Sequence, residues 1–183
     1  AQLAALRTDE LAIACRALGA RLDGFLDLPD GRLADVDRAT VDAAIDATLD
    51  RIAPQIVLTF GPDGAYGSRD HIAFAARVAA AGRRFPAVGV LYAAFPAGHF
   101  APLRRRLARA GLAIDAGVTL GVPAASVALT VQVGPYRTRK LAAIAAHRSQ
   151  LRDDDPLSFL GDGILAPLLD TEWFTVSGCA SST

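Results

Sequence analysis

Residues 55–71 read Gln-Ile-Val-Leu-Thr-Phe-Gly-Pro-Asp-Gly-Ala-Tyr-Gly-Ser-Arg-Asp-His, the most informative stretch of the chain. Its first six residues form a short apolar run, which predicts a buried β-strand over 55–60. The glycines and the proline that follow mark a loop at the carboxyl end of that strand, and the polar triplet 69–71 marks the start of a helix. Because ligands of α/β sheets gather at the carboxyl ends of strands, the stretch predicts a functional site at this loop.

On both sides of this stretch, segments with helical and with strand periodicity alternate. Asp37 is a suitable N-cap for a helix that carries a run of apolar residues on one side and ends before Pro54. The predicted helices span about 3–20, 37–53, 72–81, a segment up to 111, and 134–148, and the predicted strands span 25–28, 55–60, 86–92 and 125–133. This alternation predicts an α/β layered fold with a largely parallel sheet flanked by helices, formed by residues 1–183 as a single domain.

Charge and composition exclude several classes of partner. The 19 basic and 19 acidic residues cancel, so no overall field draws the chain to nucleic acid or to an anionic membrane. The arginines at 104–106 and 109 fall among leucine and alanine in a helical pattern, which is typical of a solvated helix face. No apolar run approaches the length of a membrane span.

The two cysteines, Cys15 and Cys179, form neither a disulfide framework nor a zinc-ribbon spacing. Cys15 has helical spacing with Leu11 and Leu18 and is expected in a core, whereas Cys179 lies in a serine-rich tail. Cytoplasmic residence therefore fits best. The sequence contains no methionine and opens directly in a helical pattern, which we interpret as a truncated beginning.

The glycines of the loop match neither of the common phosphate-binding motifs. A P-loop needs a lysine and a hydroxyl residue after its last glycine, whereas here a serine follows that glycine directly. A dinucleotide fingerprint needs glycines at a different spacing and a helix that opens within the motif. What remains is the pair Asp70 and His71 at a helix amino terminus, where a carboxylate and an imidazole can converge on a metal ion or a substrate.

Four segments together resemble the LmbE-like or PIG-L family of zinc-dependent N-acetylglucosaminyl deacetylases. They are residues 7–11, 26–31, 54–71 and 140–150, whose order and spacing are similar to the family's motifs. The resemblance implies a Rossmann-like α/β fold, a Zn²⁺ cofactor and hydrolysis of an acetamide on a glucosamine-type substrate. Zinc polarises an amide carbonyl and lowers the pKa of a bound water to about 7, which explains why such a reaction uses it.

The same resemblance implies a metal ligand and two catalytic residues. His71 corresponds to the last imidazole of a His-x-Asp-His motif and would bind the metal, together with a His and an Asp from a His-Pro-Asp-Asp loop. The sequence contains no such run, so we expect the domain to lack an amino-terminal strand-loop-helix-strand, and the general base is unassigned. Ser68 stands where the family has its first imidazole, and its hydroxyl can donate one hydrogen bond to an oxyanion. Asp70 would orient an imidazole.

Four further residues are predicted to bind substrate. Arg7 matches an arginine that binds substrate oxygen in the family, although it could also form a surface salt bridge with Glu10. Asp30 matches an acidic position near the sugar hydroxyls, and it is also a natural turn residue. Tyr66 could line the pocket mouth. His147 lies on a helix similar to the family's Lys-to-His-x-Ser-Gln helix, where it would line the site or be a partly buried structural histidine.

The central residues have ordinary structural interpretations as well. His71 could be a first-turn helix residue bonded to backbone, and Asp70 could be a helix cap. His99 lies in a loop after a predicted strand. It could replace the imidazole missing at Ser68 or be an ordinary loop histidine.

Two functions follow from these alternatives. The first is a zinc-dependent hydrolase that removes an N-acetyl or similar acyl group from a glucosamine-type conjugate, so that the partner is a small acylated amino sugar. The second is a non-catalytic relative that keeps a sugar-shaped pocket and serves as a binding or assembly module. The serine at position 68 favours the second, because a hydroxyl cannot replace an imidazole that protonates a leaving amine. No motif indicates the oligomeric state.

Overall fold

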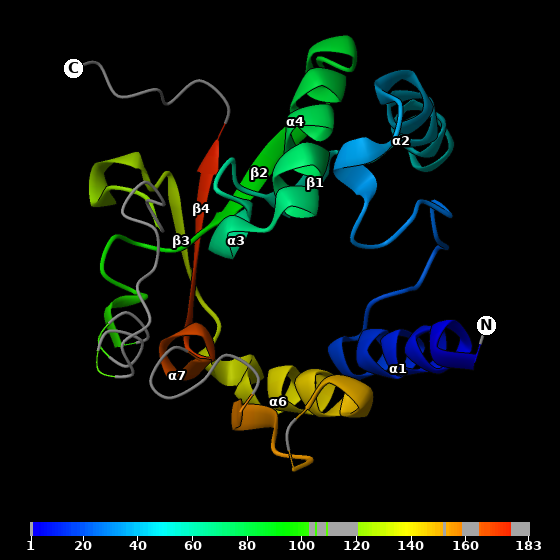
Figure 1. Cartoon of the computed structure of the whole chain (residues 1–183). Coiled ribbons are helices and arrows are strands. Elements are labelled where there is room, and N and C mark those ends of the chain that lie inside the picture. Colours follow the sequence, from blue (N-terminus) through cyan, green and yellow to red (C-terminus); the bar gives the residue numbers. More distant parts are fainter. Residues whose placement is uncertain are drawn as a thin grey trace. The chain divides into compact units, whose positions relative to one another are not determined.

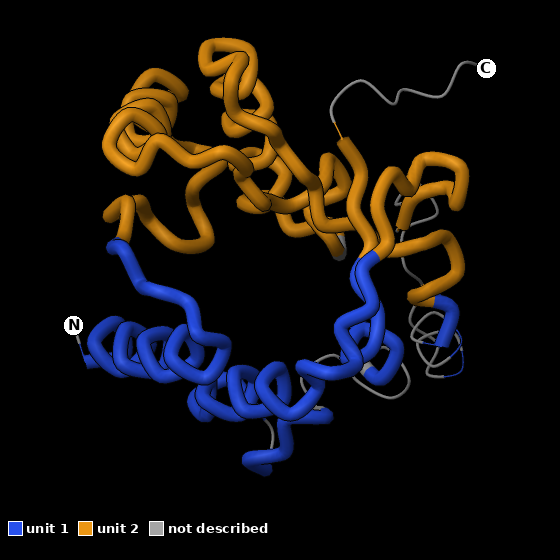
Figure 2. Tube along the Cα trace, turned by 180° about the vertical axis from the view of Figure 1, so that it is seen from behind, with its two compact units in different colours: residues 1–24, 101–112, 131–172 blue, residues 25–100, 113–130, 173–183 orange. Residues whose placement is uncertain are grey.

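The computed structural model describes residues 2–102, 105, 109, 121–151, 153–158 and 165–176. The chain divides into two compact units, coloured separately in Figure 2. Unit 1 comprises residues 1–24, 101–112 and 131–172, and unit 2 comprises residues 25–100, 113–130 and 173–183. The expected single domain over residues 1–183 stays a prediction.

Helices and strands alternate along much of the chain, as the sequence predicts (Figure 1). In chain order they are α1 (Gln2–Leu18), η1 (Leu33–Asp35), α2 (Arg38–Ile52), β1 (Ile56–Phe60), α3 (Gly64–Gly67), α4 (Arg69–Arg84), β2 (Gly89–Ala94), η2 (Ala124–Ser126), β3 (Leu129–Gln132), η3 (Gly134–Tyr136), α6 (Arg137–Ala146), η4 (Arg148–Gln150), η5 (Pro156–Ser158), α7 (Leu165–Leu168) and β4 (Thr171–Val176). The η elements are single 3₁₀ turns. The α/β class is therefore confirmed.

The core of unit 2 lies between α2, α4 and one face of the strands. Asp37 caps α2, because its carboxylate accepts a hydrogen bond from the Thr40 backbone N–H at 3.1 Å. The apolar side of α2 then packs against α4, which in turn contacts β1 and β2. The buried side chains of this cluster are Val41, Ile45, Leu49, Val78 and Ala81. The predicted cap and the predicted apolar side of α2 are both confirmed.

Strand β1 is confirmed, but the expectation that it is buried is correct for only one of its faces. Val57 packs against the core cluster, and Thr59 is buried on the same face. Ile56 and Leu58 point the other way and are 60% and 59% exposed. An apolar run cannot reveal this difference, because both faces carry apolar side chains.

The sheet is not largely parallel, so that part of the prediction is wrong. Among the described residues, the sheet has four strands in the order β1-β2-β4-β3. The pair β1–β2 is parallel, with Leu58 opposite Leu91, whereas β2–β4 is antiparallel, with Ala93 opposite Phe174. Strand β4 comes from the far end of the chain and runs against β2. Periodicity predicts a strand but carries no information on its direction.

In unit 1, α1 packs along α6 through small side chains. Ala14, Ala143 and Ala146 are buried where the two helices meet, and their short side chains allow a close approach of the two backbones. The helix α1 ends at Gly19, which adopts a φ of +73° that favours glycine. The predicted helix stop at this glycine is confirmed.

Several predicted boundaries are wrong for identifiable reasons. Residues 25–28 form no strand, and the turn at 30–31 follows an irregular segment. Helix α4 does not stop at Gly82, because this glycine is a packing residue. A Cβ at position 82 would lie 3.0 Å from Val90 Cγ2, so the bare backbone lets α4 approach β2 closely.

Some predictions fall on segments that the structure does not describe. Cys179 and most of the arginine-rich helix lie outside the described residues, although Arg105 and Arg109 are described as helical and exposed. Cys15 is half-buried with a free thiol. Within the described residues, no helix combines the length and the apolar character needed to cross a bilayer.

Candidate active site

The predicted loop after β1 is a tight, glycine-dependent turn that leads into α4. Asp63 caps the short helix α3, since its Oδ1 accepts a hydrogen bond from the Ala65 N–H at 3.1 Å. Its Oδ2 accepts a second bond, from the Gly121 N–H at 3.4 Å. Gly64 has a φ of +61°, and a Cβ there would lie 2.8 Å from Ile72 Cγ1. Only glycine therefore lets this loop close onto the first turn of α4.

The His71 imidazole is held by this loop and by the end of β1. Its Nδ1 lies 3.2 Å from the Gly64 carbonyl oxygen, and its ring stacks on Phe60 with centroids 3.7 Å apart and planes 3° from parallel. A carbonyl oxygen only accepts, so Nδ1 donates and the lone pair of the neutral ring lies on Nε2. A backbone carbonyl that fixes the tautomer in this way is the usual support of a metal-binding histidine.

The helix-cap role considered for Asp70 belongs to Ser68 instead. Ser68 is the N-cap of α4, and its Oγ accepts a hydrogen bond from the His71 N–H at 3.4 Å. Asp70 is therefore not the cap. Its Oδ1 accepts a hydrogen bond from the Leu33 N–H at 3.1 Å, which ties η1 to α4. The Ser68 hydroxyl hydrogen is not used by the cap bond, because a hydroxyl accepts and donates at once.

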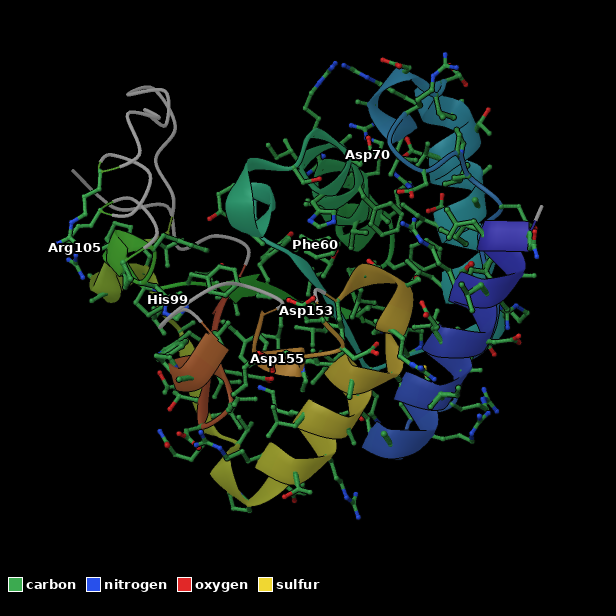
Figure 3. The ribbon with its side chains drawn as sticks, turned by 60° about the horizontal axis from the view of Figure 1, so that its bottom comes forward. Phe60, Asp70, His99, Arg105, Asp153 and Asp155 are labelled. Atoms are coloured by element: carbon green, nitrogen blue, oxygen red, sulfur yellow. The ribbon has the colours of Figure 1, made fainter. Side chains whose placement is uncertain are left out.

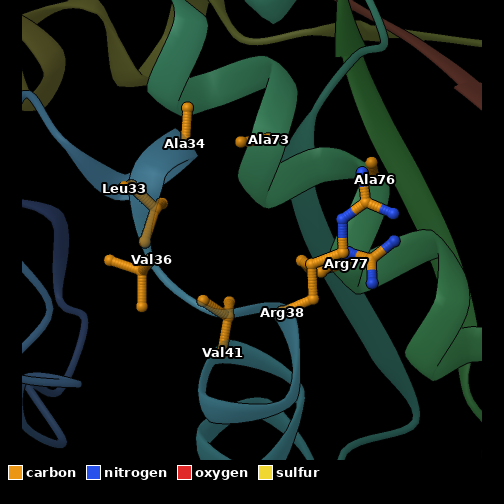
Figure 4. A pocket seen from close by; sticks show the side chains of 8 residues that line it. All are labelled: Leu33, Ala34, Val36, Arg38, Val41, Ala73, Ala76 and Arg77. Carbon is orange, nitrogen blue, oxygen red and sulfur yellow. The ribbon is translucent and has the colours of Figure 1, made fainter.

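A pocket of about 180 Å³ lies beside the Asp70–Leu33 contact, between η1, the start of α2 and α4 (Figure 4). Its lining is apolar except for two arginines, Arg38 and Arg77, both labelled in Figure 4. Arg77 also pairs with Asp42 at 3.4 Å. The described residues of the lining include no imidazole, thiol or carboxylate, so they do not form the expected metal centre.

The remaining unit 2 candidates are placed as follows. Asp30 lies in an exposed turn. Tyr66 belongs to α3, but its side chain lies outside the described part of the chain. His99 lies in an aromatic cluster, with ring centroids 5.3 Å from Phe95 and 6.0 Å from Trp173. Figure 3 labels His99 together with Phe60 and Asp70.

In unit 1, the structure brings Arg7 and His147 close to one carboxylate that the sequence analysis did not assign to the site. Glu10 is 3% exposed and accepts hydrogen bonds from the Ser149 N–H and Oγ, both at 2.7 Å. The Ser149 backbone bond lowers the pKa of Glu10, and the nearby charges of His147 and Arg7 lower it further. A sequence signal existed, because Glu10 precedes Ala14 by four residues and so shares the buried face of α1.

His71 fits one position of a zinc site, and the other positions are not formed by described residues. No group of three or more histidine, cysteine, aspartate or glutamate side chains is close enough to bind a metal within the described ranges. The chemistry of His71 nevertheless matches a zinc ligand, since the lone pair lies on Nε2 and Nδ1 is anchored.

Comparison with known proteins matches the region that contains this loop. The family described as PIG-L: GlcNAc-PI de-N-acetylase matches residues 1–81, a region that ends within α4 and includes His71. A 1D-myo-inositol 2-acetamido-2-deoxy-alpha-D-glucopyranoside deacetylase of Saccharomonospora viridis is 31% identical, over 96% of this chain and 74% of the relative.

Two further relatives carry the same name. The protein of Acidothermus cellulolyticus is 30% identical, over 94% of this chain and 68% of the relative. That of Rhodococcus opacus is 31% identical, over 96% of this chain and 71% of the relative. These relatives define a class of sugar N-deacetylases. The chain belongs to the GlcNAc-PI de-N-acetylase, or PIG-L, family, and the resemblance seen in its motifs is confirmed.

Proposed function

We propose that this chain is a zinc-dependent hydrolase that removes the N-acetyl group from a glucosamine-type conjugate. The observation that carries the proposal is the His71 imidazole, fixed by the Gly64 carbonyl and stacked on Phe60 with its lone pair on Nε2. The names of the relatives support the substrate class, because each relative is named as a deacetylase of an acetamido-sugar joined to inositol.

Each candidate residue has a task in this reaction. His71 would hold the zinc ion, which when bound supplies a Lewis acid for the acetamide carbonyl. The hydroxyl of Ser68 would donate a hydrogen bond to the oxygen that becomes negative as the carbonyl carbon turns tetrahedral. Asp70 holds η1 against the first turn of α4, and this contact would keep the loop in place during turnover.

A second set of residues would bind the sugar part of the substrate. Arg7 and His147 carry N–H donors that suit the oxygens of a sugar ring, and Asp30 carries acceptors that suit its hydroxyls. Tyr66 would line the entrance. With these assignments the substrate is a small acylated amino sugar, and the chain has no task that requires nucleic acid or a membrane. The cytoplasm is its proposed location.

A second candidate function rests on the observed state of Ser68. Its Oγ accepts the cap hydrogen bond from the His71 N–H, and its hydroxyl cannot deliver a proton near neutral pH as an imidazole can. A family member with this residue could bind an acetamido sugar without hydrolysing it.

Zinc analysis and amine release test the two functions. The full-length protein is purified with zinc, its metal content is measured, and N-acetylglucosaminyl-inositol is the substrate. We expect about one zinc per chain and release of a primary amine, both lost in His71→Ala. Arg83→Gln, an exposed position on the same helix, is the matched control and should keep both. Sugar binding without zinc or amine release would establish the binding module instead.

A further inference from the structure

A buried carboxylate joins two segments of unit 1 that lie far apart in the sequence. Glu10, on α1, is 3% exposed, and its Oε1 and Oε2 accept hydrogen bonds from the backbone N–H and the hydroxyl of Ser149 in η4. Both distances are 2.7 Å, which is the short range of hydrogen bonds to an ionised acceptor. Two bonds from one residue to the two oxygens fix the orientation of the η4 turn as well as its position.

Packing alone does not require a charge at this position. The same face of α1 buries Ala14, and α1 meets α6 at Ala143 and Ala146 through small apolar side chains. A carboxylate in such a place is unfavourable unless hydrogen bonds replace its lost hydration. The two Ser149 donors supply these bonds, so Glu10 serves to hold the turn rather than to fill space.

The turn held by Glu10 begins next to His147, and the same carboxylate lies near Arg7. Arg7 precedes Glu10 by one helical turn, and the charges of both Arg7 and His147 act on the Glu10 carboxylate. The Gln150 side-chain amide lies 3.5 Å from His147 Nδ1. An amide nitrogen only donates, so a neutral His147 ring that accepts this bond at Nδ1 carries its hydrogen on Nε2, and a charged ring carries one there as well. His147 is therefore a donor at Nε2 in either charge state.

We propose that Glu10 is a positioning residue for substrate binding, which holds the Ser149 turn on α1 so that Arg7 and His147 present their donors together to the oxygens of the sugar. The inference rests on the proposed function, because it takes Arg7 and His147 as substrate contacts. Glu10 itself touches no substrate in this scheme. Its loss therefore weakens binding of the substrate and leaves the chemical step and the metal unaffected.

Steady-state kinetics of Glu10→Gln in the zinc-loaded full-length protein test this role. Glutamine keeps the size of the side chain, but its NH₂ group is a donor and cannot accept a hydrogen bond from Ser149, so one of the two bonds is lost. We expect KM for N-acetylglucosaminyl-inositol to rise about tenfold with kcat within about twofold of wild type, the pattern of lost binding in ground and transition states alike. Zinc content should not change. Ser149→Ala should raise KM less, and the double variant should fall short of the product of the two single effects.

Two matched variants separate positioning from stability. Asp9→Asn removes the neighbouring, exposed carboxylate and should leave KM unchanged. Ala143→Gly loosens the α1–α6 contact without touching Ser149, and it should lower Tm with little effect on KM. If Glu10→Gln does not fold, Glu10→Asp and Ser149→Ala replace it, because each keeps part of the contact.

The outcomes distinguish this inference from the proposed function. An active wild type with unchanged KM in Glu10→Gln and Ser149→Ala would overturn the positioning role alone. The positioning role would also be overturned if Ala143→Gly lowered Tm as much as Glu10→Gln does and raised KM by the same factor. If the wild type binds the sugar without hydrolysis, calorimetry replaces kinetics, and Kd must rise about tenfold in Glu10→Gln. A wild type that neither binds nor hydrolyses the sugar refutes the proposed function and this inference with it.

Discussion

Gly64→Ala tests whether the loop after β1 depends on a glycine for its closure. Two effects oppose an alanine there. The φ of +61° costs an L-residue about 1–2 kcal/mol. The added Cβ would lie 2.8 Å from Ile72 Cγ1 and 3.3 Å from His71 Cβ, and such overpacking costs about 1–3 kcal/mol more. We expect the free energy of unfolding to fall by about 2–5 kcal/mol, and each kcal/mol lowers Tm by about 2–4 °C in a chain of this size.

Gly98→Ala is the matched control, because Gly98 has a φ of +89° but nothing within 4 Å of its added Cβ. It should lose only the backbone part, about 1–2 kcal/mol. The two variants are compared by urea unfolding, and zinc content is measured on each. Gly64→Ala should also weaken zinc binding about 10–100-fold, since the Gly64 carbonyl holds His71 Nδ1. Equal losses of stability in the two variants would refute the close fit of the loop to α4.

Two further predictions concern Ser68 and Glu10. Ser68→Ala should destabilise α4 by about 1 kcal/mol through loss of its cap, whereas Ser68→Asp should keep the stability; if amine release survives in Ser68→Asp, the hydroxyl is not the oxyanion donor. Because the pKa of Glu10 is lowered in the folded chain, its contribution to stability is complete above its ordinary value of 4.5 and is lost as pH falls through the lowered pKa. Acid titration of unfolding should therefore show a steeper loss below that pH in wild type than in Glu10→Gln, and equal slopes would contradict the assigned ionisation.

Local chemistry made part of the fold predictable. Asp37 is a good N-cap wherever a helix follows, and the helix stop at Gly19 uses the φ that favours glycine. The direction of the strands was not predictable, because pairing of β2 with β4 joins distant residues, such as Leu91 and Val176, and leaves no local trace. Gly82 was misinterpreted for a similar reason. Gly82 lets α4 pack closely on Val90 of β2, and this contact exists only once the helix lies on the sheet.

The candidate site divides in the same way. His71 was found because its neighbours form a motif, and its place at a helix start is correct. Its anchor was not foreseeable, since a bond to the Gly64 carbonyl requires the loop to fold back over seven residues. Asp70 was considered as a possible cap because the helix was expected to start at residue 72, and the observed start at Arg69 places the cap at Ser68. Glu10 was seen only as a partner of Arg7, because the opposing Ser149 is distant in sequence.

The arrangement at the start of α4 makes serine at position 68 a compromise between folding and chemistry. The Ser68 oxygen accepts the bond from the backbone N–H of His71, the residue assigned to the metal. An imidazole at position 68 would supply a proton donor, a group worth about 10²–10⁴-fold in rate, but histidine is not among the favoured cap residues. Serine gives up that proton and stabilises the turn from which His71 projects. The loss of the cap and the loss of an oxyanion donor are therefore separable, since aspartate can replace serine in the first role and not in the second.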